Sequence, residues 1–219
     1  MMRPDVSAGS VARPRRVVAA VAAGLGAVTA VVARAADLPS WEGVLAERTN
    51  AVPDWVADSL APVMQLGTTW AAIGIGYLIW LVRKDVQRGF ALIVAAFLTR
   101  FVSGQLKQIV DRERPGEFRS LDIEIRDTTA DGLGWPSSHA AIAAVAATIA
   151  YRALPRRWRP IVVGVAVAVG IARLVHGVHF AGDVIGGWSL GVVIGVATLE
   201  LLAPLERRAA ARSSEPGLE

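Results

Sequence analysis

The chain has 219 residues, of which 53% are hydrophobic and 19% are charged, with a mean hydropathy of +0.45. Soluble domains average about 45–50% apolar and about 25% charged residues, so this composition favours a membrane protein and excludes a disordered chain. The absence of cysteine excludes disulfides, a thiol nucleophile and cysteine-ligated metal sites. The net charge of +4 would fit a nucleic-acid partner only with one basic patch interleaved with aromatic residues, and the sequence has none.

Apolar residues concentrate in six runs, which predict an all-α integral membrane bundle of six transmembrane helices. The runs cover 17–33, 60–82, 89–106, 140–154, 161–175 and 184–202. The fourth run is shorter than the ~20 residues that usually cross a bilayer. We expect a membrane domain over 17–205, between cytoplasmic tails at 1–16 and 206–219.

Charged residues divide unequally between the two sides that six crossings create. The side with both termini carries 14 cations and 6 anions, whereas the opposite side carries 9 cations and 13 anions. An excess of Lys and Arg in short loops marks the cytoplasmic side. We therefore expect a multi-pass protein of the plasma membrane, with both termini cytoplasmic.

The first run also permits a second interpretation. Basic residues precede it and Ala33-Arg34-Ala35 follows it, a pattern typical of a cleaved signal peptide. Its apolar stretch exceeds the ~7–15 residues of such segments, so a retained span is favoured. Cleavage would leave five spans with the same orientation.

Residues 37–59 combine apolar and charged side chains at helical spacing, and Pro39 and Pro53 suit helix starts. The pattern predicts an interfacial amphipathic segment between the first two spans, with charged residues such as Glu42 between the apolar ones. A cap over the bundle is an equally good interpretation.

The sixth run carries a stripe of small residues, Gly187, Gly191 and Gly195. Such a stripe lets two helix backbones approach closely. Packing inside this bundle is the favoured interpretation and dimerisation is the alternative, so the oligomeric state is not predicted.

Polar residues collect near span ends on the predicted outer side. They are Lys107, Arg112, Arg114, Ser137, Ser138, His139, Arg173, His176, His179 and Asp183, which include all three histidines. Ionisable groups at membrane depth are costly and mark functional sites. Arginine and lysine without a matching carboxylate cluster predict an anion site, because both side chains suit phosphate.

Spacing refines this prediction. Lys107 and Arg114 are two helical turns apart and can share a face. A carboxylate at Asp183 is one turn from His179, where it would fix the tautomer and leave Nε2 as nucleophile or base. His139, from another span, suits a general acid. The alternative is a zinc site at His176 and His179, which would need a third ligand.

At these residues the sequence resembles the type 2 phosphatidic acid phosphatase family, which shares its phosphate pocket with vanadium haloperoxidases. Of the family motifs KxxxxxxRP, PSGH and SRxxxxxHxxxD, the first is complete from Lys107 to Arg114-Pro115. The second is Pro136–His139, with Ser138 where glycine is usual. The third runs from Ala172 to Asp183, with alanine where serine is usual.

The resemblance covers roughly 60–205 and implies a role for each matching residue. His179 would attack phosphorus, Asp183 would orient it, and His139 would protonate the leaving oxygen. The phosphoryl oxygens would be held by Lys107, Arg114, Arg173, Ser137 and Ser138. No metal and no cofactor are implied.

Other polar residues lie outside the motifs. His176 is expected to pack or to form a supporting hydrogen bond. Arg112, Arg119 and Arg126 either contact a headgroup or lie in a solvated loop, and the loop is favoured. Arg100 either faces the pocket or pairs with an acid.

The leading hypothesis is therefore a membrane phosphatase that acts on a lipid phosphate or diphosphate at the outer leaflet. By resemblance, phosphatidic acid, phosphatidylglycerol phosphate and polyprenyl diphosphates are plausible substrates, with membrane lipids as surroundings. A non-catalytic lipid-binding relative and a vanadate-dependent haloperoxidase are the alternatives. The presence of the nucleophile counts against the first, and the hydrophobic chain counts against the second.

Overall fold

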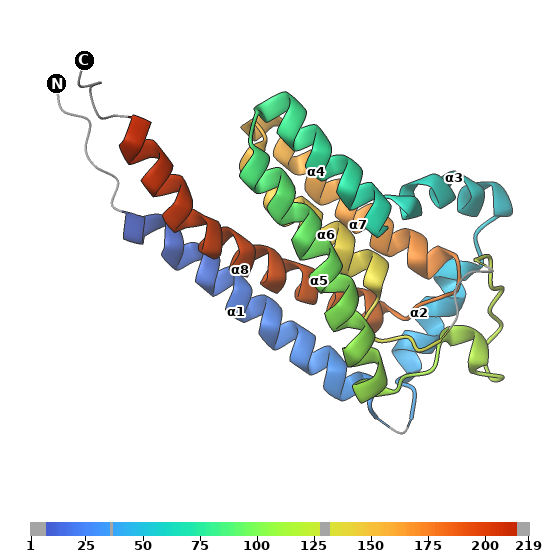
Figure 1. Cartoon of the computed structure of the whole chain (residues 1–219). Helices are drawn as coiled ribbons and strands as arrows, with labels where there is room; N and C mark the ends of the chain where they lie inside the picture. Colours follow the sequence, from blue (N-terminus) through green and yellow to red (C-terminus); the bar gives the residue numbers. More distant parts are fainter. Residues whose placement is uncertain (1–7, 36, 128–131, 214–219) are drawn as a thin grey trace, which may run out of the picture.

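The computed structural model describes residues 8–35, 37–127 and 132–213, and every regular element in these ranges is a helix. The long helices lie side by side in a bundle (Figure 1). They are α1 (Ala8–Ala33), α2 (Ser40–Asn50), α3 (Asp54–Gln65), α4 (Thr69–Arg83), α5 (Val86–Val110), α6 (Ser138–Ala153), α7 (Arg159–Val175) and α8 (Ala181–Ser213), with short 3-10 helices η1 (Pro115–Glu117) and η2 (Arg156–Trp158). The all-α prediction is confirmed.

Several helices are long and apolar enough to span a membrane. Among the described residues there are four such segments, Pro14–Ala33, Val86–Glu117, Arg156–Val175 and Ala181–Arg208. A fifth results if α3 and α4, which meet at an angle of 56°, form one broken span. The chain is therefore a membrane protein with several candidate spans, but six crossings are not confirmed.

The second apolar run, predicted as one span, is two helices. α3 ends at Gln65 and α4 begins at Thr69, where the Thr68 hydroxyl accepts a hydrogen bond from the Ala71 N–H at 3.2 Å. Gly67 in the break lies against the start of α6, so that a Cβ there would be 2.6 Å from the carbonyl oxygen of His139. Hydropathy does not reveal this break because its residues are apolar or small.

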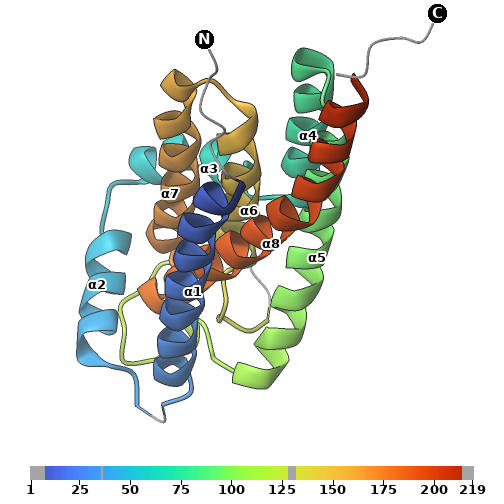
Figure 2. The same ribbon diagram turned by 90° about the vertical axis from the view of Figure 1, so that its left-hand side faces the viewer.

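The short α6 is the centre of the bundle. It packs against α4, α5, α7 and α8, which surround it in both views (Figures 1 and 2). Eleven of its 16 residues are buried, and most of these are alanines. At a rise of 1.5 Å per residue the helix is only about 24 Å long. Neighbouring helices cover most of its side chains.

The glycine stripe of α8 faces α6. A Cβ on Gly195 would lie 2.7 Å from the Cβ of Thr148, and a Cβ on Gly191 would overlap the carbonyl oxygen of Ala141. Glycine therefore allows the two backbones to touch. The stripe therefore serves packing inside the bundle, which is the favoured interpretation of the sequence.

Helix α2 buries the face opposite to the one that its sequence suggests. Pro39 and Pro53 are the N-caps of α2 and α3, so the predicted helix starts are correct. The buried residues of α2, however, are Glu42, Gly43, Ala46 and Asn50, whereas Trp41, Val44 and Leu45 are exposed. Glu42, one of the charged residues that the sequence places between the apolar ones, is fully buried.

The arrangement of the bundle brings the motif residues to one end. The beginning of α1, the end of α8 and the turn between α4 and α5 lie at one end in Figure 1. The end of α5, the beginning of α6 and the junction between α7 and α8 lie at the other end, beside α2. The three motifs belong to these three places.

Candidate active site

A cavity of about 620 Å³ lies where the three motifs meet. Its walls come from the last turns of α5, the segment before α6, the first turn of α6 and the α7–α8 junction. Six predicted site residues line it, and these are Lys107, Arg114, Ser138, His139, Arg173 and His179. Arg100 lines it too, so its side chain faces the pocket, one of the two alternatives that the sequence allowed.

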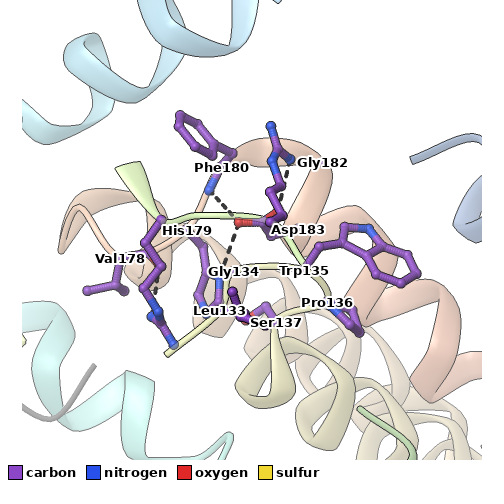
Figure 3. Close-up of polar contacts among 12 residues, drawn as sticks. Leu133, Gly134, Trp135, Pro136, Ser137, Val178, His179, Phe180, Gly182 and Asp183 are labelled. Carbon is purple, nitrogen blue, oxygen red and sulfur yellow. Dashed lines mark hydrogen bonds and ion pairs between the residues drawn. The ribbon is translucent and has the colours of Figure 1, made fainter. Parts of the chain in front are cut away.

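His179 is held by the first turn of α8. Its Nδ1 lies 3.3 Å from Oδ2 of Asp183, and both residues are buried (Figure 3). The same carboxylate oxygen accepts a hydrogen bond from the Phe180 N–H at 2.9 Å. With Nδ1 facing the carboxylate, Nε2 is the ring nitrogen left for chemistry.

A tight turn delivers His179 from α7. Gly177 has a φ of +70°, and a Cβ there would lie 2.6 Å from the carbonyl oxygen of Glu124. Asn50 of α2 binds this region, because its Nδ2 donates to the carbonyl oxygens of Val175 at 3.0 Å and Glu124 at 2.9 Å. The turn is therefore fixed from two sides.

Arg112 is not in a solvated loop, and that prediction is wrong. Its guanidinium is buried and lies 4.5 Å from the ring centroid of Phe180. Nη1 donates to Oδ1 of Asp183 at 2.9 Å, and Nη2 pairs with Oε2 of Glu42. The long cationic side chain is buried because two carboxylates compensate its charge.

Two motif cations hold the segment before α6. Lys107 Nζ donates to the carbonyl oxygens of Leu133 and, at 3.0 Å, Gly134. Arg114 donates from Nε to the Gly132 carbonyl at 2.6 Å and from Nη1 to the Val178 carbonyl at 3.0 Å. These bonds orient both cations in the wall of the cavity.

Arg173 has an acidic partner that the motifs do not include. Its Nη1 lies 2.6 Å from Oδ2 of Asp127, and both side chains are nearly inaccessible. Asp127 also lines the cavity. Sequence reasoning missed it because it stands in the segment between the first two motifs, which carries no recognisable pattern.

The two other loop arginines differ from each other. Arg119 is exposed, as expected. Arg126 is largely covered and ties the loop to α2 and α3, so the solvated-loop prediction is wrong for this residue. Its Nη1 donates to the Asn50 carbonyl at 2.7 Å, and its Nη2 pairs with Glu124 at 2.7 Å and Asp54 at 3.3 Å.

The two serines of the second motif have different surroundings. Ser137 caps α6, since its Oγ accepts from the Ala140 N–H at 3.5 Å, and its own N–H donates to the Asp183 carbonyl at 2.9 Å. It is not among the cavity-lining residues. Ser138 lines the cavity, and its Oγ lies 2.7 Å from the Oγ of Ser103. Ser138 is therefore the better placed of the two to meet a ligand.

His176 is apart from the cavity. It is buried, and its Nδ1 lies 2.7 Å from the Ala172 carbonyl oxygen. Within the described ranges, no three His, Asp or Glu side chains are grouped as a metal ion would require. The supporting hydrogen bond expected of His176 is present.

Burial and positive charge act together on the two cavity histidines. Burial lowers the pKa of the His179 imidazole well below its ordinary value, and Arg173 and Lys107 lower it further. Burial and Arg173 likewise lower the pKa of His139, to about 3. These shifts favour the neutral form of both rings at pH 7, which suits a nucleophile at His179.

Fold and site together define a helical membrane protein with a cavity lined by cations and by His179 of a buried histidine–aspartate pair. Residues 88–206 match the family described as the PAP2 superfamily. Phosphatidylglycerophosphatase B of Bacillus subtilis (strain 168) is 31% identical over 156 residues, which are 64% of this chain and 72% of that protein. The chain belongs to the PAP2 superfamily.

Solved structures share the fold. A transmembrane PAP2 type phosphatidylglycerolphosphate phosphatase from Bacillus subtilis superposes with a TM-score of 0.74 at 22% identity, covering 86% of this chain and 98% of that one. LpxE from Aquifex aeolicus superposes with a TM-score of 0.63 at 23% identity, covering 71% and 93%. The family resemblance of the three motifs is thus confirmed, and with it the enzyme class, a PAP2-type membrane lipid phosphatase.

Proposed function

We propose that the protein hydrolyses a lipid phosphate through a phosphohistidine at His179, without a metal ion. One observation carries this proposal: a buried His179–Asp183 pair and the three motif cations converge on a single cavity. Preorganised cations stabilise the charge that develops on phosphoryl oxygens in the transition state. The roles of the individual residues, taken from the motif resemblance, fit this geometry.

The reaction would have two displacements. Nε2 of His179 attacks phosphorus, the bond to the leaving oxygen breaks, and His139 donates a proton to that oxygen. Water then attacks the phosphohistidine, His139 takes its proton, and inorganic phosphate leaves with His179 restored. Asp183 holds the His179 ring throughout and stabilises its positive charge.

The proton on His139 depends on the substrate. In the empty cavity, burial and Arg173 hold its pKa near 3, which is too low for a general acid at neutral pH. A bound phosphate dianion offsets the field of the neighbouring cations and raises that pKa. His139 would therefore be protonated when the substrate is bound and neutral when the cavity is empty.

The substrate class follows from the relatives and from the surroundings of the cavity. The related phosphatases are named for phosphatidylglycerophosphate, a lipid monoester, which makes such a monoester the first candidate. A polyprenyl diphosphate is the second. The charge asymmetry supports an outer-leaflet cavity in the plasma membrane with cytoplasmic termini. The exposed apolar residues of α2, including Trp41 and Val44, suit contact with lipid.

The test is phosphate release by the purified protein from a panel of these lipids in detergent micelles, with excess chelator present. We expect release from at least one lipid, and loss of that activity in His179→Ala. His176→Ala is the matched control, because this histidine lies outside the cavity. No release from any lipid, full activity in His179→Ala, or loss of activity with chelator would each contradict the proposal.

A further inference from the structure

A chain of buried charges connects α2 to the His179–Asp183 pair. Glu42 is fully buried; its Oε2 pairs with Arg112 Nη2, and its Oε1 accepts from the Gly182 N–H at 2.8 Å. Arg112 in turn donates from Nη1 to Oδ1 of Asp183 at 2.9 Å. The order of contacts is therefore Glu42, Arg112, Asp183 and His179.

The contacts fix Asp183 in a particular orientation. One carboxylate oxygen is held by Arg112, and the other receives the Phe180 N–H and faces His179. Glu42 holds the Gly182 N–H next to Asp183, in the first turn of α8. A Cβ at Gly182 would lie 2.7 Å from Oε1 of Glu42, so no larger residue fits between α8 and this carboxylate. Both the side chain and the backbone of the Asp183 turn depend on the pair.

Stability alone is a weak reason for burying these charges. Taking a carboxylate and a guanidinium out of water is costly, and apolar residues of similar size often stabilise a protein as well or better. The Glu42–Arg112 pair is therefore better explained by geometry, since Asp183 must keep its Oδ2 directed at Nδ1 of His179. Glu42 also lies in α2, outside residues 88–206 that match the family.

We propose that Glu42 and Arg112 are positioning residues for the His179 nucleophile. Through Glu42, α2 would help to orient Asp183 in the active site. This inference rests on the proposed function of His179. Neither residue lines the cavity. Their loss would therefore misalign the nucleophile without removing any group that holds phosphate.

The expected signature is a fall in kcat with an unchanged KM. Misplacing a reacting group by about 1 Å costs on the order of 100-fold in rate. We expect Glu42→Gln and Arg112→Met each to lower kcat roughly 10- to 100-fold on this basis. The inhibition constant of orthophosphate should stay at the wild-type value, because Lys107, Arg114 and Arg173 are intact.

The double variant tests whether the two residues act as a unit. If Glu42 acts through Arg112, then Glu42→Gln/Arg112→Met loses no more kcat than Arg112→Met alone. Arg112→Lys keeps the positive charge but lacks the two Nη groups of the guanidinium that pair with Glu42 and Asp183. We therefore expect an intermediate kcat. A purely structural role would lower the yield of folded enzyme and leave the kcat of the folded fraction unchanged.

The experiment measures kcat, KM, orthophosphate inhibition and melting temperature for these variants in the full-length protein. Glu47→Gln is the matched control, because Glu47 is on the same helix and its side chain accepts a hydrogen bond from the Asp122 N–H in the loop. Wild-type kcat in folded Glu42→Gln and Arg112→Lys, multiplicative losses in the double variant, or a raised KM with unchanged kcat would overturn the inference. Full activity in His179→Ala would instead overturn the proposed function.

Discussion

Replacement of Arg173 should lower both the stability of the protein and its kcat, and a second substitution at Asp127 should restore only the stability. Arg173 and Asp127 form a buried pair at 2.6 Å, with side-chain exposures of 2% and 8%. Arg173→Met removes the arginine from a buried ion pair, a change that typically costs about 3–5 kcal/mol. Adding Asp127→Asn removes the carboxylate charge, so the double variant should recover most of the lost stability.

Activity should not recover with stability. Loss of one preorganised donor to a developing oxyanion lowers kcat by about 10²- to 10³-fold, or about 2.7–4 kcal/mol. Both Arg173→Met and the double variant lack that donor, so both should show this loss. Asp127→Asn alone keeps Arg173 and removes an anion from the cavity wall, and should therefore tighten inhibition by orthophosphate.

The assay combines thermal unfolding in detergent with phosphate release from the best lipid substrate. We expect stability to return in the double variant while kcat stays low. Wild-type kcat in the double variant would show that Arg173 does not contact the phosphoryl group. Unchanged stability in Arg173→Met would show that the ion pair with Asp127 is absent in the protein.

Two further predictions concern acidity and packing. Because burial and cations lower the pKa of His179, the neutral nucleophile persists as the pH falls through about 6.5, the ordinary pKa of histidine. The acidic limb of kcat/KM should thus lie below this pH, and a limb at or above it would refute the expectation. Gly191→Ala places a methyl group on the Ala141 carbonyl and should cost about 1–3 kcal/mol in thermal unfolding. Gly24→Ala, with no atom within 4 Å of the new Cβ, should be neutral or stabilising; equal effects of the two would contradict the α6–α8 contact.

Local patterns are sufficient to predict the motif residues that line the cavity. Lys107, Arg114, His139, Arg173 and His179 each belong to a motif with fixed spacing, and the alternation of apolar runs places the motifs at one end. The Asp183 partner of His179 follows from a spacing of one helical turn. These inferences need only short stretches of sequence.

The supporting contacts could not be predicted in this way because they join distant segments. Glu42 is 70 residues from Arg112, and on an amphipathic helix a glutamate normally faces solvent. Asp127 is 46 residues from Arg173. Each of these acids is buried only because tertiary packing brings a cation to it.

The number of membrane spans also cannot be predicted from hydropathy alone. The break at Gly67 depends on a close approach to His139, and the short α6 depends on neighbours that replace lipid around its alanines. Apolar composition is the same for a helix that faces lipid and for one that is buried in protein. The six-run pattern therefore predicted the class of fold better than its details.

Trapping of the covalent intermediate would show whether His179 is the nucleophile. The enzyme would be mixed with a radiolabelled lipid phosphate, quenched in alkali within milliseconds, digested and sequenced by mass spectrometry. The account predicts an acid-labile, alkali-stable phosphoryl group on His179, absent from His179→Ala and accumulating in His139→Ala with a good leaving group. Hydrolysis at the normal rate with no phosphate on His179 at any quench time would contradict it.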